Sequence, residues 1–189
     1  MSTIVDYQIL ELVENHQLIE GFNPEQLNPA SYDVRLSVGI HLEGQVIGPK
    51  EKRERWHPYS LEDSPYFMAP GEFVLGATEE YIRVPNDMEA VFQLKSSRGR
   101  EGYEHALAGY IDPGFHGQVT LELSNLNRRH YLPLVKGMLI GQLRFMRLDS
   151  TPTRSYAETG HYHGDIGAQP SKVSVLEALP DLDYGDLEK

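Results

Sequence analysis

The sequence predicts a mainly β protein, a sandwich or barrel-like fold with one short N-terminal helix. Three observations predict this fold class. Apolar residues recur at helical spacing only near the N-terminus, several later runs alternate apolar with polar residues, and turn-forming residues separate those runs. With 189 residues, 40% of them apolar, the chain is long enough to bury one real core.

The predicted helix covers residues 4–19. Asp6 lies near its start as a candidate cap, and glycine and proline at positions 21, 24 and 29 end it. Its apolar residues fall on one face, which we expect to pack on the core. They are Ile4, Ile9, Leu10, Leu12, Val13 and Leu18.

The predicted strands begin at Tyr32 and are short, as the period of two requires. Turn signals between them lie at APGE, PND, PG and KG. The runs are YDVRLSV (32–38), EFVLGA (72–77), YIRVP (81–85), AVFQLK (90–95), QVTLELSN (118–125) and GMLIGQLRFMRL (137–148).

The C-terminal part differs from this body. From Asp149 onward the apolar content falls, and Gly, Pro, Ser and Asp become common. We therefore predict a β domain over residues 1–150 and a separate segment over residues 151–189. Two interpretations of that segment stay open, a frayed terminus and a lid that orders over a ligand.

Charge and composition exclude several function classes. A net charge of −11 gives no general attraction to nucleic acid, and no apolar run is long enough to cross a membrane. The N-terminus has no basic region of a signal peptide, and Cys is absent, so the cytoplasm is the expected compartment. Without Cys the chain also lacks the zinc signature of the nucleobase deaminases.

Two carboxylates occupy unusual positions. Glu122 alternates with Val119, Leu121 and Leu123, which form a strand with one buried face. A glutamate there either faces solvent or, if buried, has a raised pKa that suits proton transfer. Asp112 precedes Pro-Gly, where it is either a turn former or a functional carboxylate beside a glycine-rich loop.

The segment 95-KSSRGR-100 combines hydroxyl donors with cations within six residues. That mixture suits phosphate oxygens, although many surface loops have a similar composition. No P-loop, GxSxG or GxGxxG motif occurs. His161 and His163 flank Tyr162, but no further ligand motif accompanies them, so we expect no metal site there.

Together these motifs resemble the dCTP deaminase family, within the trimeric dUTPase-like superfamily. The resemblance extends over nearly the whole chain, and the order and spacing of SSxxR, IDPGFxG and TLExxN make it specific. The matching segments are 27-LNPASYDVRL-36, 67-FMAPGEFVLGATEEYIRVPNDMEA-90, 95-KSSRGR-100, 109-GYIDPGFHGQVTLELSN-125 and 137-GMLIGQL-143.

The resemblance implies a catalytic set. Glu122 would be the general base that activates water against C4 of cytosine, without zinc. Ser96 and Arg100 would hold that water and the triphosphate. Asp112 would hold the deoxyribose 3′-hydroxyl and, in two-step members, orient the water that attacks the α-phosphate. The implied nucleotide contacts are Lys95, Ser97, Ala108, Gly109, Asp112, Tyr156, His161, Tyr162 and Asp165.

The resemblance also implies the assembly. The family fold is a distorted β-barrel or jelly-roll that forms a homotrimer, with active sites at subunit interfaces and a C-terminal segment closing them. Mg²⁺ bridging the phosphate oxygens would offset the charge of this acidic protein.

The chain departs from the family pattern in two places. The run 101-EGYEHALAG-109 is one residue shorter, brings Glu101 and Glu104 near the pocket, and has Leu107 in place of a Thr linked to feedback inhibition by dTTP. The resemblance therefore does not extend to that regulation. In the tail a Lys is replaced by His161, a Gln by Asp165 and an Arg by Lys172. Beside a triphosphate, Asp165 requires a metal between them.

Three functions follow from these residues. The first is deamination of dCTP to dUTP and ammonia. The alternative is a two-step enzyme that forms dUMP and diphosphate, or a plain nucleotide diphosphatase. The sequence cannot separate these readings, because Asp112 and its loop suit both. The third is a nucleotide-binding module that has lost catalysis through the altered stretches.

Overall fold

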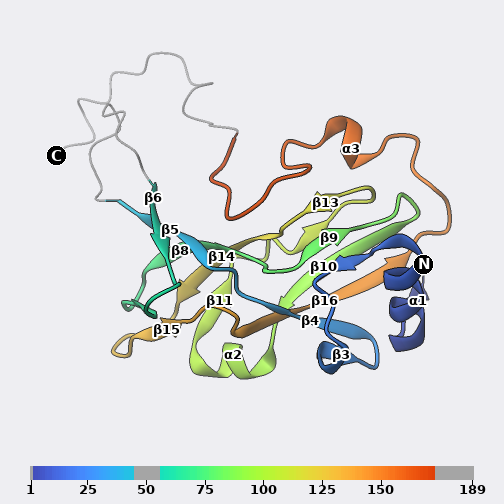
Figure 1. Ribbon diagram of the computed structural model, residues 1–189. Coiled ribbons are helices and arrows are strands. Elements are labelled where there is room, and N and C mark those ends of the chain that lie inside the picture. Colours follow the sequence, from blue (N-terminus) through green and yellow to red (C-terminus); the bar gives the residue numbers. More distant parts are fainter. Residues whose placement is uncertain (1, 45–55, 173–189) are drawn as a thin grey trace, which may run out of the picture.

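The computed structural model describes residues 2–44 and 56–172 of the chain (Figure 1). Within these residues the protein is built mainly from β-strands, as predicted. None of the described helices is long and apolar enough to cross a bilayer. Residues 52–55, which are the basic run KRER, and the end of the tail, residues 173–189, lie outside the described residues.

The largest sheet has the strand order β12-β10-β16-β4-β3, with β1 added to β16. All its pairs are antiparallel. Its strands are β1 (Ser2–Thr3), β3 (Leu27–Asn28), β4 (Ser31–Arg35), β10 (Met88–Leu94), β12 (Tyr110–Ile111) and β16 (Leu139–Arg147).

A second sheet has the order β11-β14-β8-β5-β6, and two small sheets, β13-β9-β2 and β15-β7, complete the described β-structure. The second sheet consists of β5 (Gly39–Glu43), β6 (Trp56–Ser60), β8 (Phe73–Ala77), β11 (Tyr103–His105) and β14 (Thr120–Asn125). The small sheets consist of β2 (Ile19–Glu20), β9 (Tyr81–Arg83), β13 (His116–Gly117), β7 (Tyr66–Met68) and β15 (Leu132–Leu134).

The predicted alternation in residues 118–125 is present in β14. Leu121 and Leu123 are fully buried, while Thr120, Glu122 and Ser124 on the other face are half-buried. Burying one such leucine stabilises the fold by roughly 1.5–3 kcal/mol, which fixes the strand's register. Glu122 therefore points away from the main core, toward the face where a ligand is able to reach it.

The N-terminal helix α1 (Asp6–His16) is shorter than the predicted residues 4–19. Its N-cap is Val5, whose N–H donates to Oε1 of Gln8 at 3.1 Å, so the assignment of Asp6 as cap is wrong. Ile9 and Leu12 are buried as predicted. Leu10 is exposed, so the apolar face of α1 that packs on the core is narrower than predicted.

Two further short α-helices were not predicted. The segment KSSRGR, for which no helix was predicted, contains α2 (Ser96–Glu101), which ends at Gly102 with φ 102°, a left-handed conformation that glycine adopts without strain. The tail contains α3 (Tyr156–Thr159), where the Ser155 side chain accepts a hydrogen bond from the Ala157 N–H. Figure 1 shows α2 and α3 on opposite sides of the sheets. A short 3₁₀ helix, η1 (Pro24–Gln26), precedes β3.

Candidate active site

A cavity of about 450 Å³ lies between the second sheet, the loop that follows β12 and the C-terminal tail. Its wall is largely aromatic and aliphatic, with Trp56 and Phe73 at one side. Three carboxylates also line it: Glu122, Asp112 and Asp165. The two carboxylates that stand ten positions apart in the sequence thus face the same cavity.

Glu122 is held by two neighbouring strands. In the sheet β14 lies between β11 and β8, and Glu122 is opposite Leu75. Its side chain is 27% exposed. Its Oε2 lies 3.0 Å from Nε2 of His105, close enough for an ion pair but without the alignment of a hydrogen bond. Among the described residues neither atom has a hydrogen-bond partner, and both atoms are shielded from solvent.

Sequence reasoning did not single out His105. Its side chain is only 6% exposed, and its ring lies 4.7 Å from that of Phe92. The residue follows Tyr103 at a spacing of two in β11, and pairing of β11 with β14 brings it beside Glu122. Only the strand pairing reveals this contact, because the two residues are far apart in the sequence.

Asp112 follows β12 and begins the turn to Phe115, whose N–H donates to the Asp112 carbonyl at 3.1 Å. It is therefore a turn former as well as a cavity residue. Burial raises the pKa of its carboxyl, and the nearby charge of Glu89 raises that pKa further. A carboxyl in this state accepts a proton more readily than an exposed aspartate does.

The loop before β12 brings backbone close to the site. Ala108 lines the cavity, and the Ala106 N–H donates to the Glu122 carbonyl at 3.2 Å. Gly109 is buried, and its carbonyl accepts from the Phe92 N–H at 2.7 Å. A Cβ at position 109 would collide with the carbonyl oxygen of Phe92, so this approach requires glycine.

The SSxxR motif lies elsewhere in the single chain. A second cavity, of about 640 Å³, is lined by Lys95, Ser96 and Gly109 among others. Ser97 and Arg100 are exposed on α2 and line neither cavity. The two cavities share Tyr110 as a wall residue. One chain therefore does not bring the basic motif into contact with the Glu122 cavity.

Lys95 is not free on its surface, because its ammonium group is bonded to the carboxylate of Asp33 in β4. Glu101 and Glu104, which were expected near the pocket, do not line the first cavity. Glu101 pairs with Arg98 at 2.9 Å, and Glu104 lines the second cavity. Neither adds negative charge to the first cavity wall.

The described part of the tail packs over the first cavity. Tyr156, Tyr162 and Asp165 line that cavity, whereas His161 is exposed. The Tyr156 N–H donates to the Pro113 carbonyl at 3.0 Å, and the Tyr156 ring lies 5.7 Å from that of Phe115. The tail thus contacts the same loop that carries Asp112.

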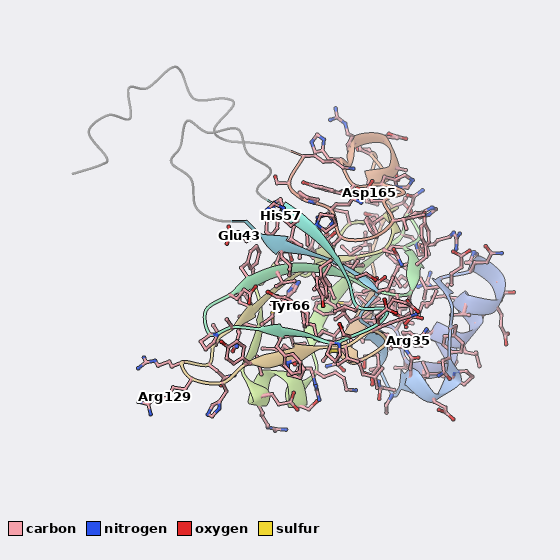
Figure 2. The ribbon with its side chains drawn as sticks, turned by 60° about the vertical axis from the view of Figure 1, so that its left-hand side comes forward. Arg35, Glu43, His57, Tyr66, Arg129 and Asp165 are labelled. Carbon is pink, nitrogen blue, oxygen red and sulfur yellow. The ribbon has the colours of Figure 1, made fainter. Side chains whose placement is uncertain are left out.

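Gln118 is a second residue that sequence reasoning missed. Its backbone N–H donates to the Asp165 carbonyl at 3.0 Å, and its side-chain Oε1 accepts from the Gly167 N–H at 2.6 Å. The Gln169 N–H also donates to Oγ1 of Thr120 at 3.1 Å. The tail therefore runs past the start of β14. Figure 2 shows Asp165 on this segment, far from the exposed Arg129.

A family model described as dCTP deaminase-like matches residues 3–148 of this chain. The chain belongs to the dCTP deaminase-like family. The family resemblance predicted from the motifs is therefore confirmed. The match ends before the tail, so the tail's role rests on its own geometry.

Curated relatives with similar sequences are named dUMP-forming dCTP deaminases. The protein of Bifidobacterium adolescentis is 40% identical over 174 residues, covering 86% of this chain and 89% of the relative. The protein of Aquifex aeolicus is 40% identical over 178 residues, covering 92% of this chain and 96% of the relative. Members of the dCTP deaminase-like family with this name thus match along most of their length.

The crystal structure of 2′-deoxycytidine 5′-triphosphate deaminase from Agrobacterium tumefaciens superposes with a TM-score of 0.62 at 23% identity. The match covers 76% of this chain and 48% of that chain, so this chain spans about half of that protein's length. At this identity the likeness shows the fold, and it confirms the mainly β architecture.

Proposed function

We propose that this protein converts dCTP to dUMP, diphosphate and ammonia, consuming two waters. The observation that carries the proposal is that Glu122 and Asp112 line one cavity of nucleoside size. The dUMP-forming names of the matched relatives favour this two-step reaction over the release of dUTP, the first reading of the sequence.

In the first step Glu122 accepts a proton from the water that attacks C4 of cytosine. The protonated carboxyl then returns the proton to the nucleobase, the bond between C4 and the amino nitrogen breaks, and ammonia leaves. His105 lies beside Oε2 of Glu122 and holds that carboxylate in place. Backbone groups around Ala108, which lines the cavity, would read the pyrimidine edge.

In the second step Asp112 orients a water toward the α-phosphate. The water oxygen forms a bond to phosphorus, the bond to the bridging oxygen breaks, and diphosphate leaves. The pKa of Asp112 is raised toward neutral pH, which suits a base that takes the water's proton.

Mg²⁺ would enter with the phosphates of the substrate. The cavity wall offers carboxylate oxygens, the hard ligands that this ion prefers, at Asp112. The ion would supply positive charge against the developing charge of the phosphates.

The proposal includes a homotrimer with active sites between subunits. Ser96, Ser97 and Arg100 lie on an exposed helix and are separated from Glu122 in one chain. Apolar side chains are exposed around the second cavity, where Leu107 is 94%, Leu126 63% and Tyr110 57% exposed. A neighbouring subunit would cover these side chains and supply the basic motif to the cavity. Residues 151–189 would act as the lid.

The test is to incubate the purified protein with dCTP and Mg²⁺ and to separate the products by ion-exchange chromatography. We expect dUMP and diphosphate in equal amounts. Release of dUTP alone would contradict the second step and leave a monofunctional deaminase. If dCTP stays unchanged, and dUTP offered in a second assay also stays unchanged, the result would indicate a nucleotide-binding module.

A further inference from the structure

The first cavity has a wall charge that conflicts with a triphosphate. Its described lining includes the carboxylates of Asp112, Glu122 and Asp165, but no Lys, Arg or His. Phosphate oxygens bind best to charged donors such as ammonium and guanidinium groups. A nucleotide in this cavity therefore needs a cation from just outside the wall.

Lys172 is such a cation. Its ammonium Nζ donates to Oδ2 of Asp165 at 2.5 Å and to the carbonyl of His161 at 2.9 Å. It also lies 5.1 Å from the centre of the Tyr162 ring. Asp165 and Tyr162 both line the cavity, so the ammonium group is directly behind its wall.

The backbone next to this side chain also meets the cavity. The Lys172 N–H donates to the Tyr162 hydroxyl at 3.0 Å, and the preceding residue, Ser171, lines the cavity. The Lys172 side chain is 39% exposed, so its ammonium group is not sealed in the protein. Four methylene groups let it turn to a new acceptor while the backbone stays in place.

The side chain of His161 cannot supply the positive charge of Lys172 to the cavity. It is exposed and outside the cavity, and its contact with Lys172 is through the backbone carbonyl. Asp165 meanwhile is only 19% exposed and has a lysine beside it, so its charge is already compensated in the free protein.

We propose that Lys172 is the phosphate-binding cation of the tail, and that Asp165 holds it in the free protein until a nucleotide phosphate replaces that carboxylate. This inference rests on the proposed function, since it assumes a nucleoside triphosphate in the cavity. It assigns to Lys172 a contact with the phosphates and none with the base or sugar.

The experiment measures kcat/KM for dCTP and the inhibition constant of deoxycytidine, which has no phosphate. Lys172→Met keeps the length and apolar stem of the side chain but removes the charge. We expect kcat/KM for dCTP to fall about tenfold, the effect of one lost charged hydrogen bond. Deoxycytidine inhibition should stay unchanged, and Lys172→Arg should restore most of the loss.

Asp165→Asn provides the second arm. It frees Lys172 and removes repulsion, so we expect KM for dCTP to fall by up to about fivefold, the scale of a partly exposed ion pair. In the double variant Asp165→Asn with Lys172→Met, this gain should disappear. A rise in KM for Asp165→Asn that depends on the Mg²⁺ concentration would instead assign Asp165 to a metal and overturn the inference.

The controls separate the inference from the proposed function. If wild-type protein turns over dCTP and the Lys172→Met variant has an equal kcat/KM, the inference is overturned but the proposed function is not. An equal loss for dCTP and deoxycytidine also overturns it, because Lys172 would then only support the tail. Wild-type protein that neither binds nor turns over dCTP overturns both.

Discussion

Nε2 of His105 lies 3.0 Å from Oε2 of Glu122, on strands that are paired neighbours in the second sheet. His105 is nearly fully buried and its ring packs against Phe92. The carboxylate is therefore held by a rigid wall rather than by a mobile loop. Such preorganisation is what a proton-transferring group requires.

Glu122→Gln tests the role of this carboxylate. The change is nearly isosteric and removes the base, so we expect ammonia release to fall by about 10²–10⁴-fold. Nucleotide binding and thermal stability should be retained. The matched control is Glu62→Gln, a change at an exposed glutamate that pairs with Lys136. Deamination near the wild-type rate in Glu122→Gln would remove Glu122 from the mechanism.

Arg100→Ala should lower kcat more than it raises KM, as expected for a group acting mainly in the transition state. Its position on the exposed helix α2 allows a sharper test. If Arg100 serves a neighbouring subunit, hybrids of Arg100→Ala and Glu122→Gln chains contain some intact sites. We expect co-expressed hybrids to regain up to about a quarter of the activity.

Each variant purified alone is the control for that experiment and should stay inactive. Hybrid formation is checked by giving the two variants different affinity tags. Verified hybrids without regained activity would mean that Arg100 and Glu122 do not meet between subunits.

Asp112→Asn should separate the two chemical steps. We expect diphosphate release to fall by about 10²–10⁴-fold while ammonia is still formed and dUTP accumulates. Equal loss of both products would limit Asp112 to holding the sugar.

The same variant should also be more stable at pH 7. Burial, and then Glu89, raise the pKa of Asp112 in the folded protein. Because this pKa is raised, the charged form of Asp112 destabilises the fold at any pH above the pKa of Asp112 in the unfolded chain. Asparagine carries no charge and avoids this cost. Thermal unfolding should therefore occur at higher temperature than in wild-type protein. The control, Asp87→Asn, removes an exposed partner of Arg147 and should give no such gain.

The fold should lose stability as the pH falls below about 6.5, the ordinary pKa of histidine. Burial lowers the pKa of His116, and the neighbouring His163 and Arg83 lower it further. In the window between the lowered value and 6.5 the unfolded chain binds more protons, so stability rises with pH there.

Thermal unfolding between pH 5 and 8 measures this dependence. His116→Gln should flatten it, whereas His57→Gln, a change at an exposed histidine, should not. The His116 ring lies 5.1 Å from that of His163 in the tail, so acid should loosen the tail first. An unchanged slope in His116→Gln would assign the dependence to other groups.

The strand pattern could be predicted because burial of one face leaves a period of two in the sequence. Residues 118–125 show it clearly, and β14 has the predicted burial. The helix α2 was missed because SSRGR carries no apolar face. A helix this short is stabilised by its surroundings in the fold rather than by its own residues. The cap of α1 was misassigned by one position, since local signals place helix ends only approximately.

The sequence by itself determined the strands, the apolar faces and the chemistry of the motifs, because these depend on residue type and spacing along the chain. Only the tertiary structure decided which side chains meet. Pairing of β11 with β14 joins His105 to Glu122, and packing of the tail joins Lys172 to Asp165 near the cavity. Both contacts depend on strand register and chain reversal, which side-chain packing over the whole core selects.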